Sequence, residues 1–450
     1  MVSNKLKSWR LFLALSGSLG GLMLAAPDAQ AVPSMARQTG YECAKCHTVF
    51  PELTPFGRQF KLGAFTNSSD KWDAKPVLER LPFSGALKVS QAKTSNTETP
   101  GAMPTDFPQE NKLFAETVAA YYGGKITNNS GALVQYNYDG VEKKWAMEMF
   151  DVRFANSVTV AGRDLAYGVT LNNSPTVSDI YNSTPSWGFP NGNGLAKMPA
   201  ATLVDMTLAS KVGGVGVYGI WNDLIYAEVA GYRTAKTGAF RFMGWGVDQD
   251  QVLDSNAPYW RLALQQEIGP NSFEVGTYGL VGDVRVNPEV GGATDHFRDI
   301  GFDASYQYIK GPHIVSAHGN WIREKQTWDQ NAGRDDRPTP DAKGTLNTFR
   351  ADVRYSFKRT WSGALGYFET SGSSNNRYNT GDAVMGSANA SPDAKGWITE
   401  VNYLTSSHPH LKLSLRYTAF QKFNGASTNY VPGRNASDNN NLYLTAWLPF

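Results

Sequence analysis

The sequence predicts an all-β fold, a 16-stranded antiparallel outer-membrane β-barrel (porin-like) preceded by a small N-terminal domain. Three observations carry this prediction. From Leu81 to the last residue, apolar and polar side chains alternate with period two. The connections between the strands are alternately short and long, and the chain ends in an apolar strand with a terminal Phe450. Strands with this alternation, joined by short turns at one end and longer loops at the other, are typical of transmembrane barrels.

The alternation separates an apolar face from an ionic face. In the segment 346–358 the apolar residues share one face, namely Phe349, Ala351, Val353, Tyr355 and Phe357. The opposite face is mostly charged, with Arg350, Asp352, Arg354 and Lys358. In a soluble sandwich the apolar face would pack on a second sheet, whereas in an outer-membrane barrel it would contact lipid and the ionic face would line the lumen.

Loop lengths favour the barrel. We predict strands at 81–93, 112–127, 130–138, 147–161, 162–174, 202–221, 224–234, 258–268, 271–284, 297–309, 312–325, 346–358, 360–371, 396–405, 410–423 and 440–450. Because their number is even, the N-terminal domain and the C-terminus are both expected on the periplasmic side. An aromatic girdle is predicted from tryptophans near strand ends, Trp145, Trp260, Trp361 and Trp397.

The first thirty-one residues have the features of a signal peptide. Lys5, Lys7 and Arg10 precede an apolar stretch, and Ala29-Gln30-Ala31 forms a cleavage site, so we expect removal of residues 1–31 and export to the periplasm of a Gram-negative cell. Removal lowers Lys+Arg from 42 to 39 and Asp+Glu from 40 to 39. A formally neutral chain argues against nucleic acid as a partner.

Residues 32–80 form the predicted N-terminal domain, and they contain the motif C-x-x-C-H. Cys43 and Cys46 are spaced to form thioethers with one haem c, and His47 is placed to be its proximal iron ligand. A disulfide or a redox dithiol is the alternative for two cysteines. A zinc site would need further closely spaced ligands, which the sequence lacks. The motif therefore predicts a monohaem c-type cytochrome domain.

A domain of about fifty residues is too small to bury a haem alone. We therefore expect it to be inserted in the barrel lumen, whose ionic wall would complete the haem environment. The second axial ligand has three candidates, His318, Met149 and Met35, of which His318 is ranked first. Other histidines are expected outside the lumen, His296 in a long loop and His313, His408 and His410 at short turns.

The segments Ala36–Gly40, Cys43–His47 and Phe50–Arg58 resemble the N-terminal signature of the fused cytochrome–porin iron oxidases of neutrophilic iron-oxidising bacteria. The close match covers about thirty residues. This resemblance implies oxidation of extracellular Fe(II), with electrons passed through the haem to periplasmic c-type cytochromes. The chain departs from the family pattern at Met35, where phenylalanine is usual.

Other charged residues have two interpretations each. Arg37, Arg58 and Lys61 are candidates to neutralise haem propionates, or to dock the domain on lumen acids such as Asp205, Glu228 and Asp352. The loop carboxylates Asp248, Asp250, Asp335 and Asp336 would suit Fe(II), or they are a solvated surface.

Competing functions are a conduit for another electron donor or acceptor, and a diffusion porin in which the haem domain is a plug or sensor.

Overall fold

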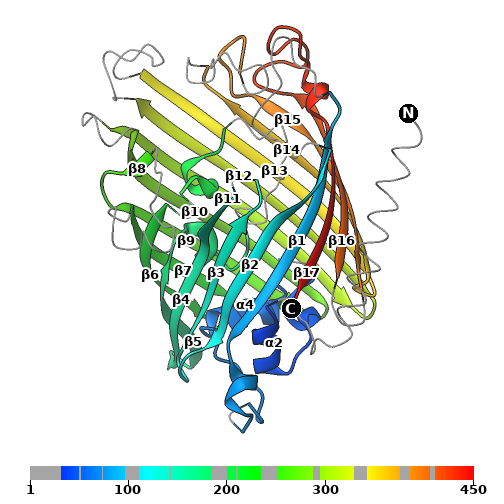
Figure 1. Ribbon diagram of the computed structural model, residues 1–450. Coiled ribbons are helices and arrows are strands. Elements are labelled where there is room, and N and C mark those ends of the chain that lie inside the picture. The colour runs from blue at the N-terminus through cyan, green and yellow to red at the C-terminus, as the bar shows by residue number, and fades with distance from the viewer. Residues whose placement is uncertain are drawn as a thin grey trace, which may run out of the picture.

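The computed structural model describes residues 32–49, 52–72, 74–96, 111–141, 143–183, 200–208, 211–234, 251–286, 294–328, 342–374, 386–405 and 411–450. The signal peptide predicted at 1–31 lies outside these residues. The described chain begins with short helices, α2 (Pro33–Thr39), α3 (Cys43–Cys46) and α4 (Pro55–Leu62), and a 3₁₀ turn, η1 (Val77–Arg80). Figure 1 shows these helices at one end of a large barrel. No helix in the described part of the chain is long and apolar enough to cross a membrane.

A single sheet contains all the strands. In chain order they are β1 (Phe83–Thr94), β2 (Leu113–Lys125), β3 (Ser130–Asp139), β4 (Lys144–Val160), β5 (Arg163–Asn172), β6 (Val212–Trp221), β7 (Ile225–Thr234), β8 (Gln251–Leu253), β9 (Ala257–Ile268), β10 (Asn271–Val286), β11 (Asp295–Lys310), β12 (His313–Trp328), β13 (Ala342–Phe357), β14 (Trp361–Gly372), β15 (Ala394–Leu404), β16 (Lys412–Lys422) and β17 (Asn441–Pro449). Every pairing is antiparallel, and β1 pairs with both β2 and β17, which closes the barrel.

The strand count agrees with the prediction of sixteen. The three-residue β8 pairs with the same strand, β10, as β9 does, and it extends that ladder beyond Leu280. β8 and β9 therefore occupy one position in the barrel. Each of the sixteen predicted segments corresponds to one long strand, and the ends differ by a few residues except at the start of β6.

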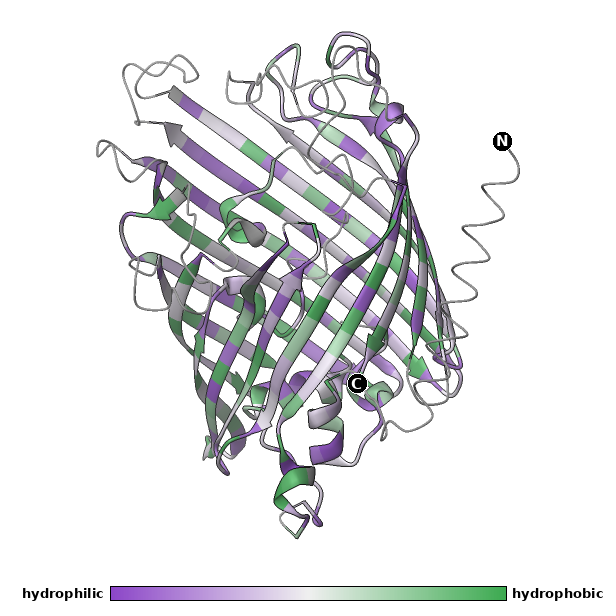
Figure 2. Ribbon diagram, in the orientation of Figure 1, coloured by the Kyte–Doolittle hydropathy of each residue, from purple (hydrophilic) through white to green (hydrophobic). Residues whose placement is uncertain are grey.

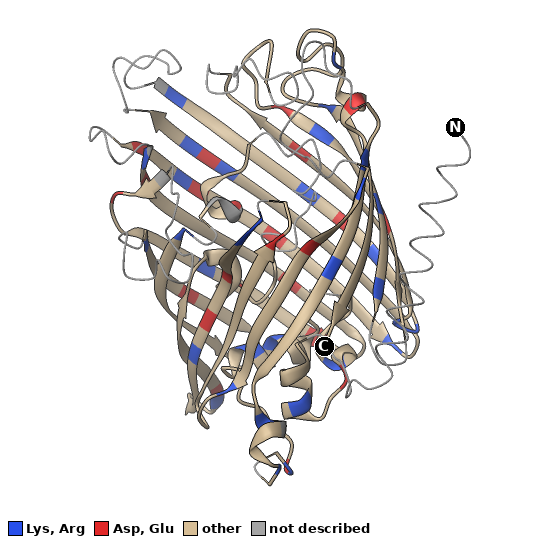
Figure 3. Ribbon diagram, viewed as in Figure 1, with Lys and Arg blue, Asp and Glu red and all other residues tan. Residues whose placement is uncertain are grey.

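The two faces of the sheet have opposite character. Large apolar side chains are exposed on the outside, among them Val353, Tyr355, Phe302 and Leu415, and so are the four predicted girdle tryptophans. Figure 2 shows the resulting alternation of hydropathy along the strands, and Figure 3 shows charges of both signs on them. The lumen side is ionic: buried Arg261 lies 2.9 Å from Glu274 and 2.7 Å from Asp303. A closed barrel with an apolar exterior satisfies its backbone hydrogen bonds in lipid, so the fold is a porin-like outer-membrane barrel.

The barrel has a short-turn end and a long-loop end. Within the described ranges, short turns join β2 to β3, β4 to β5, β6 to β7, β9 to β10, β11 to β12 and β13 to β14. The C-terminus lies at the short-turn end, near helices α2 and α4 (Figure 1). Phe450 is held there by backbone hydrogen bonds of 2.7 and 2.8 Å with Gly85.

One strand boundary differs from the prediction. A strand was expected from residue 202, but β6 begins at Val212, and Leu203–Thr207 forms a π-helical turn, η2. The Leu203 and Val204 side chains are buried on inward-facing residues such as Tyr232 and Leu280. Their amides donate to wall carboxylates, Leu203 N to Glu324 Oε2 at 2.6 Å and Val204 N to Asp299 Oδ2 at 2.7 Å. The apolar residues of this stretch therefore face a buried cluster inside the barrel instead of lipid.

Candidate functional site

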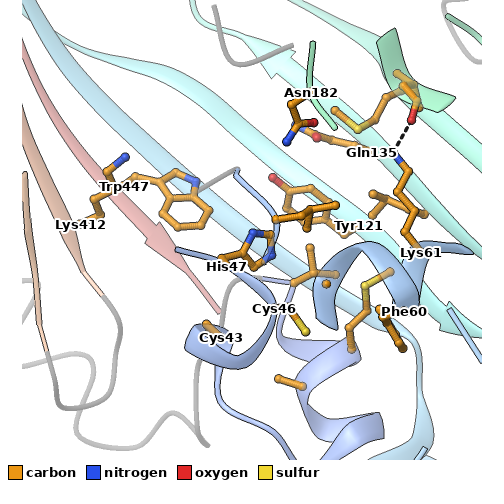
Figure 4. A pocket seen from close by; sticks show the side chains of 18 of the residues that line it. Cys43, Cys46, His47, Phe60, Lys61, Tyr121, Gln135, Asn182, Lys412 and Trp447 are labelled. Carbon is orange, nitrogen blue, oxygen red and sulfur yellow. Dashed lines mark hydrogen bonds between the residues drawn. The ribbon is translucent and has the colours of Figure 1, made fainter. Parts of the chain in front are cut away.

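The C-x-x-C-H motif forms one helical turn that ends at His47. Helix α3 consists of Cys43–Cys46, and the His47 amide donates to the Cys43 carbonyl at 2.9 Å. His47 then adopts extended backbone and pairs with Leu53 in an isolated antiparallel bridge. The two thiols are not joined in a disulfide. Figure 4 shows the Cys46 sulfur near the His47 ring, with Cys43 on the same helical turn.

Helix α4 holds this turn in place. Thr54 caps α4 by accepting from the Gly57 amide at 3.1 Å, and Pro55 occupies the first helical position. The Thr54 hydroxyl also donates to the Lys45 carbonyl at 2.7 Å. Gly57 is required where the two helices meet, because a Cβ there would lie 2.2 Å from the Cys46 carbonyl oxygen. The packing of α4 on this turn therefore fixes the motif.

Glu52 attaches this segment to the barrel wall. The carboxylate accepts from Gln307 Nε2 at 2.6 Å and from Ser316 Oγ at 2.9 Å, and Oε1 lies 3.3 Å from His318 Nε2. Burial alone would raise the pKa of Glu52, but the His318 imidazole, which pairs with it, brings that pKa to about 2. Glu52 is therefore ionised at neutral pH, and it connects the segment to β11 and β12.

Three cations complete the docking. Arg58 Nη2 donates to Ser272 Oγ at 2.8 Å, and Arg37 Nη2 donates to the Phe83 carbonyl at 2.6 Å. Lys61 Nζ donates to the carbonyls of Val177 at 2.5 Å and Asp179 at 3.0 Å. In the structure these three cations contact neutral groups of the barrel and of the connection after β5. The acids proposed for them pair within the barrel: Asp205 with Arg350, Glu228 with Tyr226 and Asp352 with His318.

The connection between β5 and β6 contributes the opposite wall. Residues 173–183 turn into the barrel, with α5 (Pro175–Ser178) at their centre. Arg153 Nη2 donates to the Ser178 carbonyl at 2.6 Å, and Ser183 Oγ donates to Asp303 Oδ2 at 2.7 Å. Leu62 of α4 packs in the same buried cluster as Ile180 and Tyr181. Burial, together with the nearby Arg153, lowers the pKa of Lys61 to about 8. The helical segment is therefore enclosed between the wall and this connection.

Between the segment and the wall lies a cavity of about 490 Å³. Cys43, Cys46 and His47 line it from the segment, together with apolar groups such as Leu53 and Phe60. Tyr121, Leu133 and Trp447 line it from β2, β3 and β17. Figure 4 places the His47 ring between Trp447 and Tyr121. The volume falls within the range of about 300–1,000 Å³ that is usual for cofactor sites.

The structure changes the order of the predicted axial candidates. Met35 and Met149 line the cavity, whereas His318, which was ranked first, does not. The two ring nitrogens of His318 face Glu52 at 3.3 Å and Asp352 at 3.5 Å, so its role in the structure is docking. Met149 enters the cavity at a β-bulge in the β3–β4 ladder, where Glu148 is the additional residue. The Met35 methyl group points towards Gly123 of β2.

The sequence predictions missed the charged residues that the wall supplies. Four cations from β1, β13 and β16 line the cavity, namely Lys88, Arg354, Lys412 and Arg416. Their strands are far apart in the sequence, and only barrel closure brings them together. Inward orientation was readable from the alternation, but the height of each residue in the lumen was not.

Other predicted residues lie elsewhere. His296 was expected in a long loop, but it belongs to β11, and its Nδ1 lies 2.6 Å from Asp283 Oδ1 because the strand extends beyond its predicted start. His313 begins β12 at a short turn, as predicted. Asp248, Asp250, Asp335, Asp336, His408 and His410 lie outside the described residues. Within the described ranges, no group of three or more His, Cys, Asp or Glu side chains could hold a metal ion.

Comparison with known proteins concerns the barrel. The sequence matches no protein-family model and no curated protein. The structure is similar to OmpF of Salmonella typhi in complex with daunomycin, with 11% identity, a TM-score of 0.45, and coverage of 82% of this chain and 97% of that chain. It is also similar to the outer membrane channel DcaP of Acinetobacter baumannii, with 12% identity, a TM-score of 0.45, and coverage of 82% and 96%. An anion-selective porin from Comamonas acidovorans has 12% identity, a TM-score of 0.44, and coverage of 82% and 97%.

Proposed function

We propose that this protein is an outer-membrane electron-transfer protein that oxidises extracellular Fe(II) with one covalently bound haem c and passes electrons to a periplasmic c-type cytochrome. The observation that carries the proposal is the placement of the C-x-x-C-H turn inside the barrel, beside a cavity that segment and wall form together. A redox motif enclosed in a membrane barrel would connect two compartments. The choice of Fe(II) as donor rests on the resemblance of the N-terminal segments.

The residues around the cavity fit a haem. Cys43 and Cys46 are in one helical turn at the cavity, which suits two thioether bonds, and the His47 ring is directed into it. Aromatic and aliphatic side chains form much of the lining, as a tetrapyrrole requires. Met149 and Met35 both line the cavity, and the thioether of either one would be available as a second ligand to the haem iron.

When bound, the haem supplies a one-electron centre: each Fe(II) becomes Fe(III), and the electron goes on to an oxidised cytochrome. The work of the chain is positioning. Cys43, Cys46 and His47 hold the group, and the hydrogen bonds of Glu52 and Arg58 fix the segment in the lumen. The connection at 173–183 covers one side of the segment, through the Lys61 hydrogen bond and the packing of Leu62.

The barrel architecture supports an orientation. Short turns are periplasmic in outer-membrane barrels, and longer loops are extracellular. The helical segment and the C-terminus would therefore lie at the periplasmic end, where a soluble cytochrome has access. The donor would approach from the long-loop end.

The alternatives differ in measurable ways. A diffusion porin is compatible with the barrel, but the lumen holds the helical segment and the connection at 173–183. Liposomes that contain the protein should therefore show little swelling with small sugars. Swelling comparable to that of an open porin would favour the porin with a haem plug. A conduit for another donor or acceptor would contain the same haem and would differ in its response to Fe(II).

The deciding experiment uses outer membranes that contain the oxidised protein. Haem attachment is measured first, with a Cys43→Ser/Cys46→Ser double variant as the control that cannot form thioethers. Fe(II) is then added without oxygen while the haem absorption bands are recorded, and dithionite defines full reduction. We expect reduction by Fe(II). A haem that stays oxidised with Fe(II) but is reduced by dithionite would refute iron oxidation, and absence of covalent haem would refute the whole proposal.

A further inference from the structure

The charges around the cavity are unevenly distributed. Among the described lining residues, five are cations, Lys61, Lys88, Arg354, Lys412 and Arg416, and three are carboxylates, Glu42, Glu148 and Glu400. Figure 4 places Lys412 beside Trp447 on one side of His47, with Lys61 and Gln135 on the other side. The cavity therefore has a cationic end at the barrel wall.

We define the cationic cluster as Arg354, Lys412 and Arg416 around Glu400. Arg416 donates to Glu400 through Nε at 2.7 Å and lies 2.6 Å from the same oxygen through Nη2. Arg354 Nη2 lies 3.9 Å from the other carboxylate oxygen. The Arg354 and Glu400 side chains are only 9% and 5% exposed, and that of Arg416 is 16% exposed. Lys412 lies on the same strand as Arg416 and lines the same cavity, so three cations are gathered near one buried carboxylate.

This arrangement favours an anionic ligand. Charges removed from water are costly unless opposite charges compensate them. Lys88 already has Glu116 at 2.7 Å. The cluster holds three cations and the carboxylate of Glu400, with Glu52 also near Arg354, and it faces a cavity large enough for a cofactor. Guanidinium and ammonium groups bind carboxylates with charge-assisted hydrogen bonds. A ligand with carboxylate groups would match the positive sign of the cluster.

We infer that the cationic cluster on β13 and β16 binds the two propionate groups of the haem. This inference rests on the proposed function, since it names the residues that would neutralise the group held by Cys43, Cys46 and His47. Arg58 and Arg37, the earlier candidates, have their donors directed to Ser272 and Phe83, and Lys61 binds two backbone carbonyls. The barrel wall, not the cytochrome segment, supplies the counter-charge.

The test compares two substitutions of opposite sign. Lys412→Gln removes a cation and should lower the haem midpoint potential, because the oxidised form carries one more positive charge than the reduced form. Glu400→Gln removes a carboxylate and should raise the potential. For each we expect a change of about tenfold in the reduction equilibrium constant, or about 59 mV for a one-electron couple. Lys422→Gln is the matched control. Lys422 lies on the same strand as Lys412, about 33 Å further along it, and its side chain pairs with Asp393.

Resonance Raman spectra provide a readout that is independent of electron transfer. The propionate bending band should shift in Lys412→Gln and Arg354→Gln, and it should stay unchanged in Lys422→Gln. Opposite potential shifts together with the Raman change would support the inference. Potentials and Raman bands equal to those of the control would overturn it. A wild-type protein without covalent haem would instead refute the proposed function, so the two failures are distinguishable. If Lys412→Gln does not fold, the sign of the Glu400→Gln shift decides.

Discussion

The docking of the cytochrome segment can be tested at Glu52. Substitution of Glu52 by Gln keeps the size of the side chain but removes the charge that faces His318 Nε2 at 3.3 Å. It also converts the bonds from Gln307 at 2.6 Å and Ser316 at 2.9 Å into neutral ones. Hydrogen bonds to charged groups contribute about 1.5–3 kcal/mol and neutral ones about 0.5–1.5 kcal/mol. Two weakened hydrogen bonds and one lost ion pair should together reduce the free energy of docking by about 3 kcal/mol. This corresponds to a decrease of about a hundredfold in the docking equilibrium constant.

Hydrogen exchange measured by mass spectrometry reports this equilibrium. If the segment leaves the wall before its amides exchange, Glu52→Gln should accelerate exchange in residues 32–65 by about a hundredfold, while strands β5 to β10 stay protected. Asp164→Asn is the control, because the Asp164 side chain is exposed near the start of β5 and faces Thr159 at 3.5 Å. Equal exchange of the segment in the two variants would refute the docking role of Glu52.

Three further predictions follow from the geometry. Gly57→Ala should decrease the yield of haem-loaded protein, because the added Cβ would lie 2.2 Å from the Cys46 carbonyl oxygen. Gly231→Ala is the control, because a Cβ at Gly231 has no atom within 4 Å. Equal yields of the two variants would contradict the claim that Gly57 is required for close packing of the motif. Acid should release the segment: the pKa of Glu52 is about 2 in the folded protein, so the stability that it provides is complete above about pH 4.5 and is lost as the pH falls towards 2. Proteolysis of the segment at pH 5 and pH 3 measures this loss, and a pH dependence that persists in Glu52→Gln would exclude Glu52 as its source. Met149→Leu should alter the oxidised haem spectrum, whereas His318→Ala should leave axial ligation unchanged; the reverse result would restore His318 as a ligand.

Much of the barrel could be predicted from the sequence because the patterns that indicate it, alternation within a strand and the length of each turn, are local in the sequence. Alternation along 346–358 identified which side chains of β13 face lipid, and the exposure of Val353 and Tyr355 confirms it. Turn length and strand number do not depend on distant contacts either. The error at 202–211 has a physical reason: Leu203 and Val204 look like strand residues, but they are buried against side chains from remote strands.

The candidate site likewise has a part that is local in the sequence and a part that depends on distant residues. Spacing alone indicates Cys43, Cys46 and His47, because thioether attachment needs only a short motif. The partners of that motif depend on register and barrel closure. Glu52 meets Ser316 and His318 across more than 260 residues, and Arg354 approaches Glu400 from a strand two positions away.

The sequence by itself determined the barrel, the inward or outward direction of most strand residues, and the motif that predicts haem attachment. Only the tertiary structure decided how high in the lumen each inward residue lies. That height follows from strand stagger and from where the helical segment docks, and neither is encoded within one strand. It separates His318 from the cavity and brings Arg354, Lys412 and Arg416 to it. The motif is therefore local, but its environment is a property of the closed barrel.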